Sequence, residues 1–289
     1  MKNGSFRERA VAFTTSHAQL IGVLHTPDYL TTDIGVIVVV GGPQYRVGSH
    51  RQFVLLARDL AAKGIPVLRF DYSGMGDSGG KAATFEQASP DIGAAIDFML
   101  GNVRGLSKVC LWGLCDAASA ALMYAHEDPR VARLLLLNPW VRTDSGLAQA
   151  YIENYYGRRL RSAAFWRKVL GNPAALLRSA RDFVRNLASA RSKPAGRLGG
   201  RSQGSFLDRM RDGAAAFGGP ILILLSGRDT VATEFELMRQ RDSGWAAAFD
   251  RGAVDVRRLD AADHTFSTRE WRDWVAANSA AFVAEAPKP

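Results

Sequence analysis

Cys115 stands between an apolar run and a run with helical composition, where its side chain could act as a nucleophile. The run Val109–Trp112 is typical of a strand buried on both faces, and the small residues of Ala117–Tyr124 favour a helix. A strand that turns sharply into a helix needs small residues on both sides of the apex. Gly113 and Ala117 provide them, so we expect Cys115 to lie exposed at the apex.

The five residues 113–117 match the G-x-S-x-G pattern of a nucleophile elbow with two changes. Ala117 replaces the second glycine and is still small, and Cys115 replaces the serine. A helix N-terminus favours the thiolate form of a cysteine, which is the nucleophilic form. The alternative is a buried core cysteine, the commonest location of a free cysteine. The pattern alone leaves both interpretations open.

Acyl chemistry by such a nucleophile needs a base and an acid that holds the base in the right tautomer. Asp229 follows the apolar run 220–226, and His264 follows the last predicted strand, 254–259. Because ligands and catalytic groups gather at the carboxyl ends of parallel strands, we expect Cys115, Asp229 and His264 to meet there. Their order along the chain is nucleophile, acid, histidine.

Other residues compete for the roles of base and acid. His17 and His25 lie in a predicted N-terminal hairpin, and His126 lies near the end of the helix after the elbow, while His50 is a candidate for substrate contact. Asp263 is adjacent to His264 and is expected to point elsewhere. The alternative place for the acid, Asn138-Pro139, has no carboxylate, which favours Asp229.

An oxyanion needs two backbone N–H donors. One is expected from Asp116, the residue after the apex, whose carboxylate is also favoured there by the helix dipole. The other is expected from the loop 41–44. Pro43 has no N–H, so Gly42 and Gln44 both remain candidates.

Positioning these residues requires an α/β fold, a mainly parallel eight-stranded sheet with helices on both faces. Apolar and β-branched runs predict strands at 9–15, 19–25, 34–40, 64–71, 109–112, 131–138, 220–226 and 254–259. Helical patterns cover 52–63, 91–100, 117–124 and 270–284. The core is expected at 1–139 and 217–289, and 140–216 is expected to be a helical, Arg-rich cap inserted between the sixth and seventh strands.

The predicted cap carries most of the positive charge. From Arg158 to Arg211 there are fourteen Lys or Arg and two acids, whereas the whole chain has a net charge of +9. The segment is either a solvated helical face or a docking surface for an anionic group. Trp140, Arg158 and Arg159 are the candidates for substrate contact. No nucleic-acid motif is present.

Composition restricts the remaining possibilities. The chain has 289 residues, 47% of them hydrophobic, which is enough for one large core. We find no signal peptide and no run of about 18 apolar residues, so we expect no membrane insertion and a cytoplasmic location. An extended strand separates Cys110 from Cys115 beyond disulfide reach. No metal site and no cofactor are expected.

The elbow, the Gly-Gly-Pro loop, Gly-Arg-Asp229 and Asp-His264-Thr-Phe together resemble the α/β-hydrolases. The segment Asp71–Ser78 is similar to the D-x-x-G-x-G-x-S segment common in that superfamily. The Gly-Leu-Cys-Asp elbow resembles that of the exosortase A system-associated hydrolases, type 1. That resemblance implies gene neighbourhoods for exopolysaccharide synthesis that include acyl-ligase and carrier-protein genes.

We therefore expect a hydrolase that acts on an ester or a thioester of the acyl-carrier or acyl-CoA type, through a Cys115 acyl-enzyme. An acyl carrier protein is a possible partner. An acyltransferase with an amine or alcohol acceptor is the first alternative, and an inactive binding module with the same fold is the second.

Overall fold

The computed structural model describes residues 4–41, 44–141 and 204–285. The chain divides into one unit made of Met1–Val141 and Ser205–Pro289 and a second unit, Arg142–Gly204. The second unit lies outside the described residues except for Gly204, so the predicted helical cap stays a prediction. Among the residues described, no helix combines the length and the apolar character needed to cross a bilayer.

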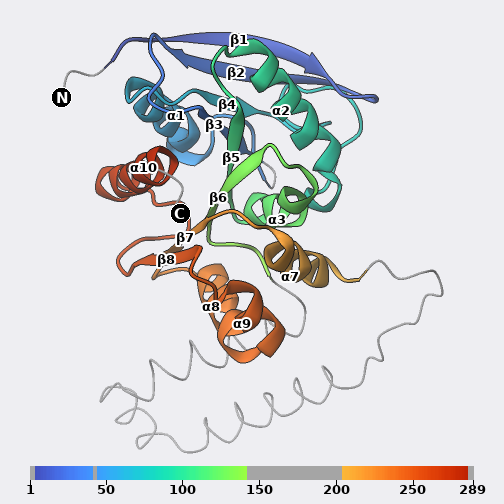
Figure 1. Ribbon diagram of the computed structural model, residues 1–289, viewed down its shortest axis with the longest axis vertical. Helices are drawn as coiled ribbons and strands as arrows, with labels where there is room; N and C mark the ends of the chain where they lie inside the picture. Colours follow the sequence, from blue (N-terminus) through green and yellow to red (C-terminus); the bar gives the residue numbers. More distant parts are fainter. Residues whose placement is uncertain (1–3, 42–43, 142–203, 286–289) are drawn as a thin grey trace, which may run out of the picture. The chain divides into compact units, whose positions relative to one another are not determined.

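A single eight-stranded sheet runs through the first unit in the order β1-β2-β4-β3-β5-β6-β7-β8 (Figure 1). The strands β3 to β8 are parallel to one another, and the β1–β2 hairpin pairs antiparallel with β4. The expected mainly parallel α/β sheet is therefore confirmed. The strands are β1 (Phe6–Thr14), β2 (Gln19–Pro27), β3 (Ile34–Val39), β4 (Val67–Phe70), β5 (Lys108–Leu114), β6 (Val131–Leu137), β7 (Ile221–Ser226) and β8 (Val254–Leu259).

Helices cover both faces of the sheet (Figure 1). One face packs against α1 (Gln52–Ala62) and α10 (Arg269–Ala284), with Trp112 and Leu137 in that part of the core. The opposite face packs against α2 (Ser89–Asn102), α3 (Asp116–Tyr124) and α7 (Phe206–Ala216). Strand residues point alternately to the two faces, so β5 and β6 supply apolar side chains to both cores.

The central strands are apolar on both sides because both faces are covered. All six residues of β3 and all six of β7 are buried. The edge strand β8 instead alternates between half-buried and exposed residues. Cys110 on β5 is fully buried, and this burial raises the pKa of its thiol to about 12. Cys110 is therefore a core residue.

The observed boundary of the second unit differs from the one expected at 217. Helix α7, which the sequence analysis placed in the cap, contributes Met210 and Ala214 to the core beside α3. Gly213 approaches α3 so closely that a Cβ there would lie 2.3 Å from the carbonyl oxygen of Leu122. Two further helices, α8 (Thr230–Arg241) and α9 (Ser243–Phe249), follow β7 and were not predicted.

Candidate active site

Cys115 forms the apex between β5 and α3, with backbone angles φ 62° and ψ −123°. A non-glycine residue at positive φ is strained, and such strain is typical of a nucleophile elbow. Gly113 is needed because a Cβ there would lie 2.6 Å from the carbonyl carbon of Ala117. Ala117 is fully buried, so its small side chain fits inside the turn. The Cys115 side chain is half-buried and accessible from solvent.

Asp229 and His264 lie in contact although the loops that carry them are far apart in the sequence. Nδ1 of His264 is 2.7 Å from Oδ2 of Asp229. The carboxylate is 7% exposed and also accepts from the backbone N–H groups of Val231 and Ala232, at 3.1 and 3.3 Å, as the N-cap of α8. These bonds hold the carboxylate in one orientation and direct Nδ1 of His264 toward it.

The surroundings of His264 favour the protonated ring. Burial alone lowers the pKa of His264, but the hydrogen bond to Asp229 and the proximity of Asp229 and Cys115 raise it to about 10. Because Asp229 occupies Nδ1, Nε2 is the ring nitrogen left for the thiol. Asp229 therefore favours a protonated ring, and a cation beside a cysteine favours the thiolate form of its side chain.

The loop that carries His264 is held by its own side chains. Asp263 accepts from the backbone N–H groups of Thr265 at 3.2 Å and Ser267 at 3.0 Å. Its carboxylate is thus engaged within the loop and does not contact the His264 ring. Phe266 sits at φ 50°, a second strained residue, and its ring is buried.

Asn138 connects the site to two strand ends, and the sequence analysis assigned it no role. It follows β6 directly, is fully buried, and has φ 43°. Its Nδ2 donates to the carbonyl oxygen of His264 at 3.0 Å, and its Oδ1 accepts from the N–H of Ser226 at 2.9 Å. Asparagine tolerates positive φ better than most residues, and its amide can donate and accept at once. The only sequence signal is its position after a strand, where other chains of this topology carry an acid.

The two segments expected to supply oxyanion donors lie together. Asp116 is the first residue of α3, and a Cβ on Gly41 would lie 2.0 Å from its Oδ1 and 2.7 Å from the nitrogen of Ala117. The end of β3 therefore passes directly against the elbow. Gln44 is half-buried, and Gly42 lies outside the described residues. The choice between Gly42 and Gln44 stays open.

An ion pair between Arg46 and Asp71 anchors the loop that follows β3. Asp71 is fully buried and accepts from the backbone N–H of Arg46 at 2.6 Å and of Asp77 at 3.1 Å. The guanidinium of Arg46 also contacts Asp71 and bonds to Asp77 at 2.6 Å. The segment resembling D-x-x-G-x-G-x-S therefore ties β4 to the loop after β3.

The remaining predicted contact residues have different locations. Burial raises the pKa of Asp263, but hydrogen bonds from Ser267 and Thr265 and, to a smaller extent, the nearby His50 lower it. The exposed His50 therefore lies near the His264 loop. The backbone of Trp140 touches the elbow, with its N–H donating to the carbonyl of Cys115 at 3.2 Å. Arg158 and Arg159 lie outside the described residues, and their contact with substrate stays a prediction.

The competing histidines lie elsewhere. His25 is fully buried beneath Arg69, whose Nε donates to its Nε2 at 2.9 Å. Burial and the charge of Arg69 lower the pKa of His25 to about 4, so it is neutral at physiological pH. His17 lies beside Ser73 and Asp91, and His126 lies in the short turn after α3.

A sequence profile for the family described as Hydrolase_4, serine aminopeptidase, S33, matches residues 34–240. No curated protein matches the chain at a significant level.

Solved structures with the same fold cover nearly the whole chain. The Pyrococcus furiosus esterase Pf2001 is 18% identical, covers 94% of this chain and 91% of its own, and has a TM-score of 0.60. The esterase domain of a Rhodothermus marinus protein is 19% identical, with coverages of 96% and 98% and a TM-score of 0.58. Est1E from Butyrivibrio proteoclasticus, solved with ferulic acid bound, is 15% identical, with coverages of 94% and 97% and a TM-score of 0.58.

Proposed function

The chain belongs to the serine aminopeptidase S33 family of α/β-hydrolases, and we propose that it cleaves acyl esters or thioesters through a Cys115 acyl-enzyme. In this proposal His264 is the general acid and then the general base, and Asp229 orients it. The chain departs from the serine in its family's name, because a cysteine stands at the elbow.

One observation carries the proposal. The strained apex residue is a cysteine, and it interacts with a histidine whose pKa is raised to about 10 by Asp229 and Cys115 after the lowering effect of burial. A cysteine thiol ionises far more readily than a serine hydroxyl, so its proton can move to the imidazole and leave a thiolate beside an imidazolium. Such a thiolate attacks without needing a base.

The acylation step follows from this pair. The thiolate of Cys115 attacks the substrate carbonyl carbon and forms a carbon–sulfur bond, while the carbonyl electrons move to oxygen. Backbone N–H groups of the elbow and of the loop after β3 receive that oxyanion in the proposal. When the intermediate collapses, the carbon–heteroatom bond to the leaving group breaks, and the imidazolium of His264 protonates the departing alkoxide or thiolate.

Deacylation returns the site to its starting state. Acylation removes the negative charge of Cys115, so one of the two groups that hold the proton on His264 is lost and the neutral ring forms more readily. The neutral ring then takes a proton from water as water attacks the thioester, and the sulfur leaves as thiolate beside a restored imidazolium. An amine or an alcohol in place of water would give acyl transfer, and thioesters react readily with amines.

The substrate class rests on the chemistry of the nucleophile and on charge. Fourteen basic and two acidic residues lie between Arg158 and Arg211, which favours an anionic acyl donor such as a phosphopantetheine thioester on CoA or on a carrier protein. Two of those basic residues are neutralised locally, because Arg209 pairs with Glu86 and Arg211 with Asp208 and Asp212. The esterases of similar fold are consistent with a simpler ester.

The test is the covalent intermediate. The protein is mixed with p-nitrophenyl butyrate or butyryl-CoA, quenched in acid, digested and analysed by mass spectrometry. We expect a butyryl group on the peptide that contains Cys115, together with a burst of released leaving group equal to the enzyme concentration. A butyryl group on another residue, or turnover without any adduct and without a burst, would contradict the proposal. Neither turnover nor adduct with any acyl donor would favour the inactive binding module.

A further inference from the structure

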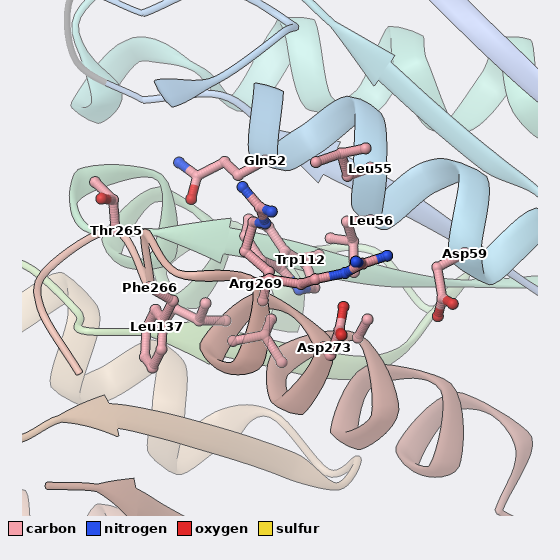
Figure 2. Close-up of a pocket in the computed structure, with 13 residues that line it drawn as sticks. Gln52, Leu55, Leu56, Asp59, Trp112, Leu137, Thr265, Phe266, Arg269 and Asp273 are labelled. Atoms are coloured by element: carbon pink, nitrogen blue, oxygen red, sulfur yellow. The ribbon is translucent and has the colours of Figure 1, made fainter. Parts of the chain in front are cut away.

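A cavity lies on the face of the sheet that α1 and α10 cover. It has a volume of about 430 Å³ and opens between the two helices. Figure 2 shows its lining side chains, which come from α1, α10, the two central strands β5 and β6, and the loop after His264. This volume lies within the range of small-molecule sites, about 300–1,000 Å³.

The inner wall of the cavity is apolar. Its fully or nearly buried members are Leu56, Trp112, Leu137, Phe266 and Val275. Phe266 stacks on Trp274, with ring centroids 6.1 Å apart, and its positive φ holds the ring in the wall. A wall of this kind accepts an alkyl chain or a ring.

One polar group of the wall lacks a partner among the described residues. Gln52, the first residue of α1, is 8% exposed, and its Nε2 makes no hydrogen bond. A buried N–H donor without an acceptor is unfavourable, so the site gains stability from a molecule that carries an acceptor. Figure 2 shows Gln52 at the cavity with Thr265 and Arg269.

The rim of the cavity is charged. Arg269 and Arg272 come from the first turn of α10, and Asp59 of α1 and Asp273 of α10 also line the cavity. Asp59 already pairs with Lys63. Within the described part of the chain, neither guanidinium has a hydrogen bond or an ion pair, in contrast to other arginines such as Arg257, which pairs with Asp255.

The charges therefore favour one negative charge on the ligand. Two guanidinium groups against the single unpaired carboxylate of Asp273 leave an excess of one positive charge at the rim. A carboxylate offers two acceptor oxygens, which suits an arginine fork and the amide N–H of Gln52 at once. The apolar wall has the size for a short chain or a ring attached to that carboxylate.

We propose that the cavity between α1 and α10 is a binding site for a monocarboxylate with an apolar body, held by Arg269, Arg272 and Gln52. Cys115 does not line the site, and the proposal does not depend on the proposed catalytic function. Thr265 and Phe266 belong to its wall and follow His264 in the sequence, so the ligand lies behind the loop that carries the candidate base.

Isothermal titration calorimetry with octanoate tests the proposal, with octanamide as the neutral counterpart and octylamine as the cationic one. We expect octanoate to bind with one-to-one stoichiometry, and octanamide and octylamine to bind at least about tenfold more weakly. Arg269→Gln combined with Arg272→Gln should weaken octanoate binding by a similar factor. Arg104→Gln, which removes an exposed arginine far along the chain from the cavity, should leave binding unchanged.

A cavity-filling variant locates the ligand. Ala276 lines the cavity and is 8% exposed, so Ala276→Phe should abolish octanoate binding. Circular dichroism and the melting temperature test whether the variant folds. If it does not fold, the result with the Arg269→Gln, Arg272→Gln double variant decides the question. Octanoate that binds equally well to both variants would occupy another site, such as the one at Cys115, and would overturn the proposal. So would equal binding of octanoate and octanamide, or no binding at millimolar concentration.

Discussion

The side-chain Nδ2 of Asn138 donates a hydrogen bond to the backbone carbonyl of His264 at 3.0 Å, across 126 positions of the sequence. Because its Oδ1 also accepts from Ser226 on β7, the buried amide fixes the height of the His264 loop above the sheet. Asn138 is therefore a positioning residue for the candidate base and not an acid.

Replacing Asn138 by Asp keeps its size and its acceptor but replaces the donor by an oxygen that faces the carbonyl of His264. We expect kcat to fall roughly tenfold to hundredfold with little change in KM, because the base is displaced while the pocket is kept. The free energy of unfolding should fall by about 1–3 kcal/mol, since the carbonyl loses its partner. Steady-state kinetics and urea unfolding measure the two effects. A loss of stability with unchanged kcat would reduce Asn138 to a structural role.

Cys115→Ala should abolish turnover, by at least about 10³-fold, while the melting temperature stays near that of the unmodified protein. Cys115→Ser should also lose most activity, because a hydroxyl does not ionise as a thiol does and has to be deprotonated during the attack. Cys110→Ala is the matched control, since Cys110 is fully buried on β5, the strand that leads to Cys115. Iodoacetamide should label Cys115 at neutral pH and spare Cys110. Activity of the Cys115→Ala variant within tenfold of the unmodified protein would remove Cys115 from the mechanism.

The pH profile should report the charge of His264. Burial lowers its pKa, but Asp229 and Cys115 raise it to about 10, so the imidazolium that pairs with the thiolate persists until the pH rises through about 10. The alkaline limb of kcat/KM for acylation should therefore lie near pH 10. Asp229→Asn removes one of the two groups that raise the pKa, and should move this limb to lower pH. An alkaline limb at the same pH in both proteins would show that another group controls it.

The raised pKa of His264 also makes the free energy of unfolding depend on pH, and the direction of that dependence is fixed. The pKa of His264 is raised on folding, so its protonated ring stabilises the folded state fully below about pH 6.5, the ordinary value for histidine. That contribution is lost as the pH rises through about 10. The difference in unfolding free energy between the unmodified protein and Asp229→Asn should therefore be largest at neutral and acidic pH and should shrink above pH 10. Urea unfolding at pH 6, 8 and 10.5 measures it.

The pair of Arg46 and Asp71 should matter far more for stability than the pair of Arg58 and Glu8. Asp71 is fully buried, so Arg46→Met leaves a buried carboxylate short of a partner and should cost about 3 kcal/mol of unfolding free energy. Arg58 and Glu8 are 43% and 30% exposed, so Arg58→Met should cost less than about 1 kcal/mol. Urea unfolding of the two variants, side by side, makes the comparison. Similar losses would mean that the Arg46 pair does not anchor its loop.

The basic segment from Arg158 to Arg211 should make kcat/KM depend on salt for charged substrates and not for neutral ones. Its net positive charge should attract an anionic substrate such as butyryl-CoA and speed its encounter, and ions screen this attraction beyond a Debye length of about 10 Å at 0.1 M salt. We expect kcat/KM for butyryl-CoA to fall steeply with added salt, and that for p-nitrophenyl butyrate to change little. Charge reversal at Arg158, Arg159, Arg178, Arg181 and Arg185 should reproduce the fall at low salt. An equal salt response for both substrates would indicate an ordinary solvated surface and favour a small neutral ester.

Several features of this protein follow from the sequence alone. The buried parallel strands β3 and β7 are visible in the sequence as continuous apolar runs, because each packs on two faces. The edge strand β8 also has the bounds predicted for it, 254–259. The small residues around Cys115 identify the sharp turn, because a larger side chain at Gly113 collides with α3. The positions of Asp229 and His264 after their strands suffice to nominate them, because parallel strands end at one edge of the sheet.

Other features depend on contacts between distant segments, which no local pattern encodes. Three examples are the antiparallel pairing of β2 with β4, the packing of α7 on the core, and the hydrogen bonds by which Asp229 caps the N-terminus of α8. In the sequence, Asn138 is only an asparagine that follows a strand. Its positioning role depends on the fold, which brings the backbones of His264 and Ser226 to its side-chain amide. Likewise, the pKa of the His264 ring depends on Asp229 and Cys115, which follow other strands, and the cavity beside Phe266 exists only where α1 and α10 meet. Tertiary structure decided these properties because electrostatics and packing depend on distance in space, whereas the sequence records only distance along the chain.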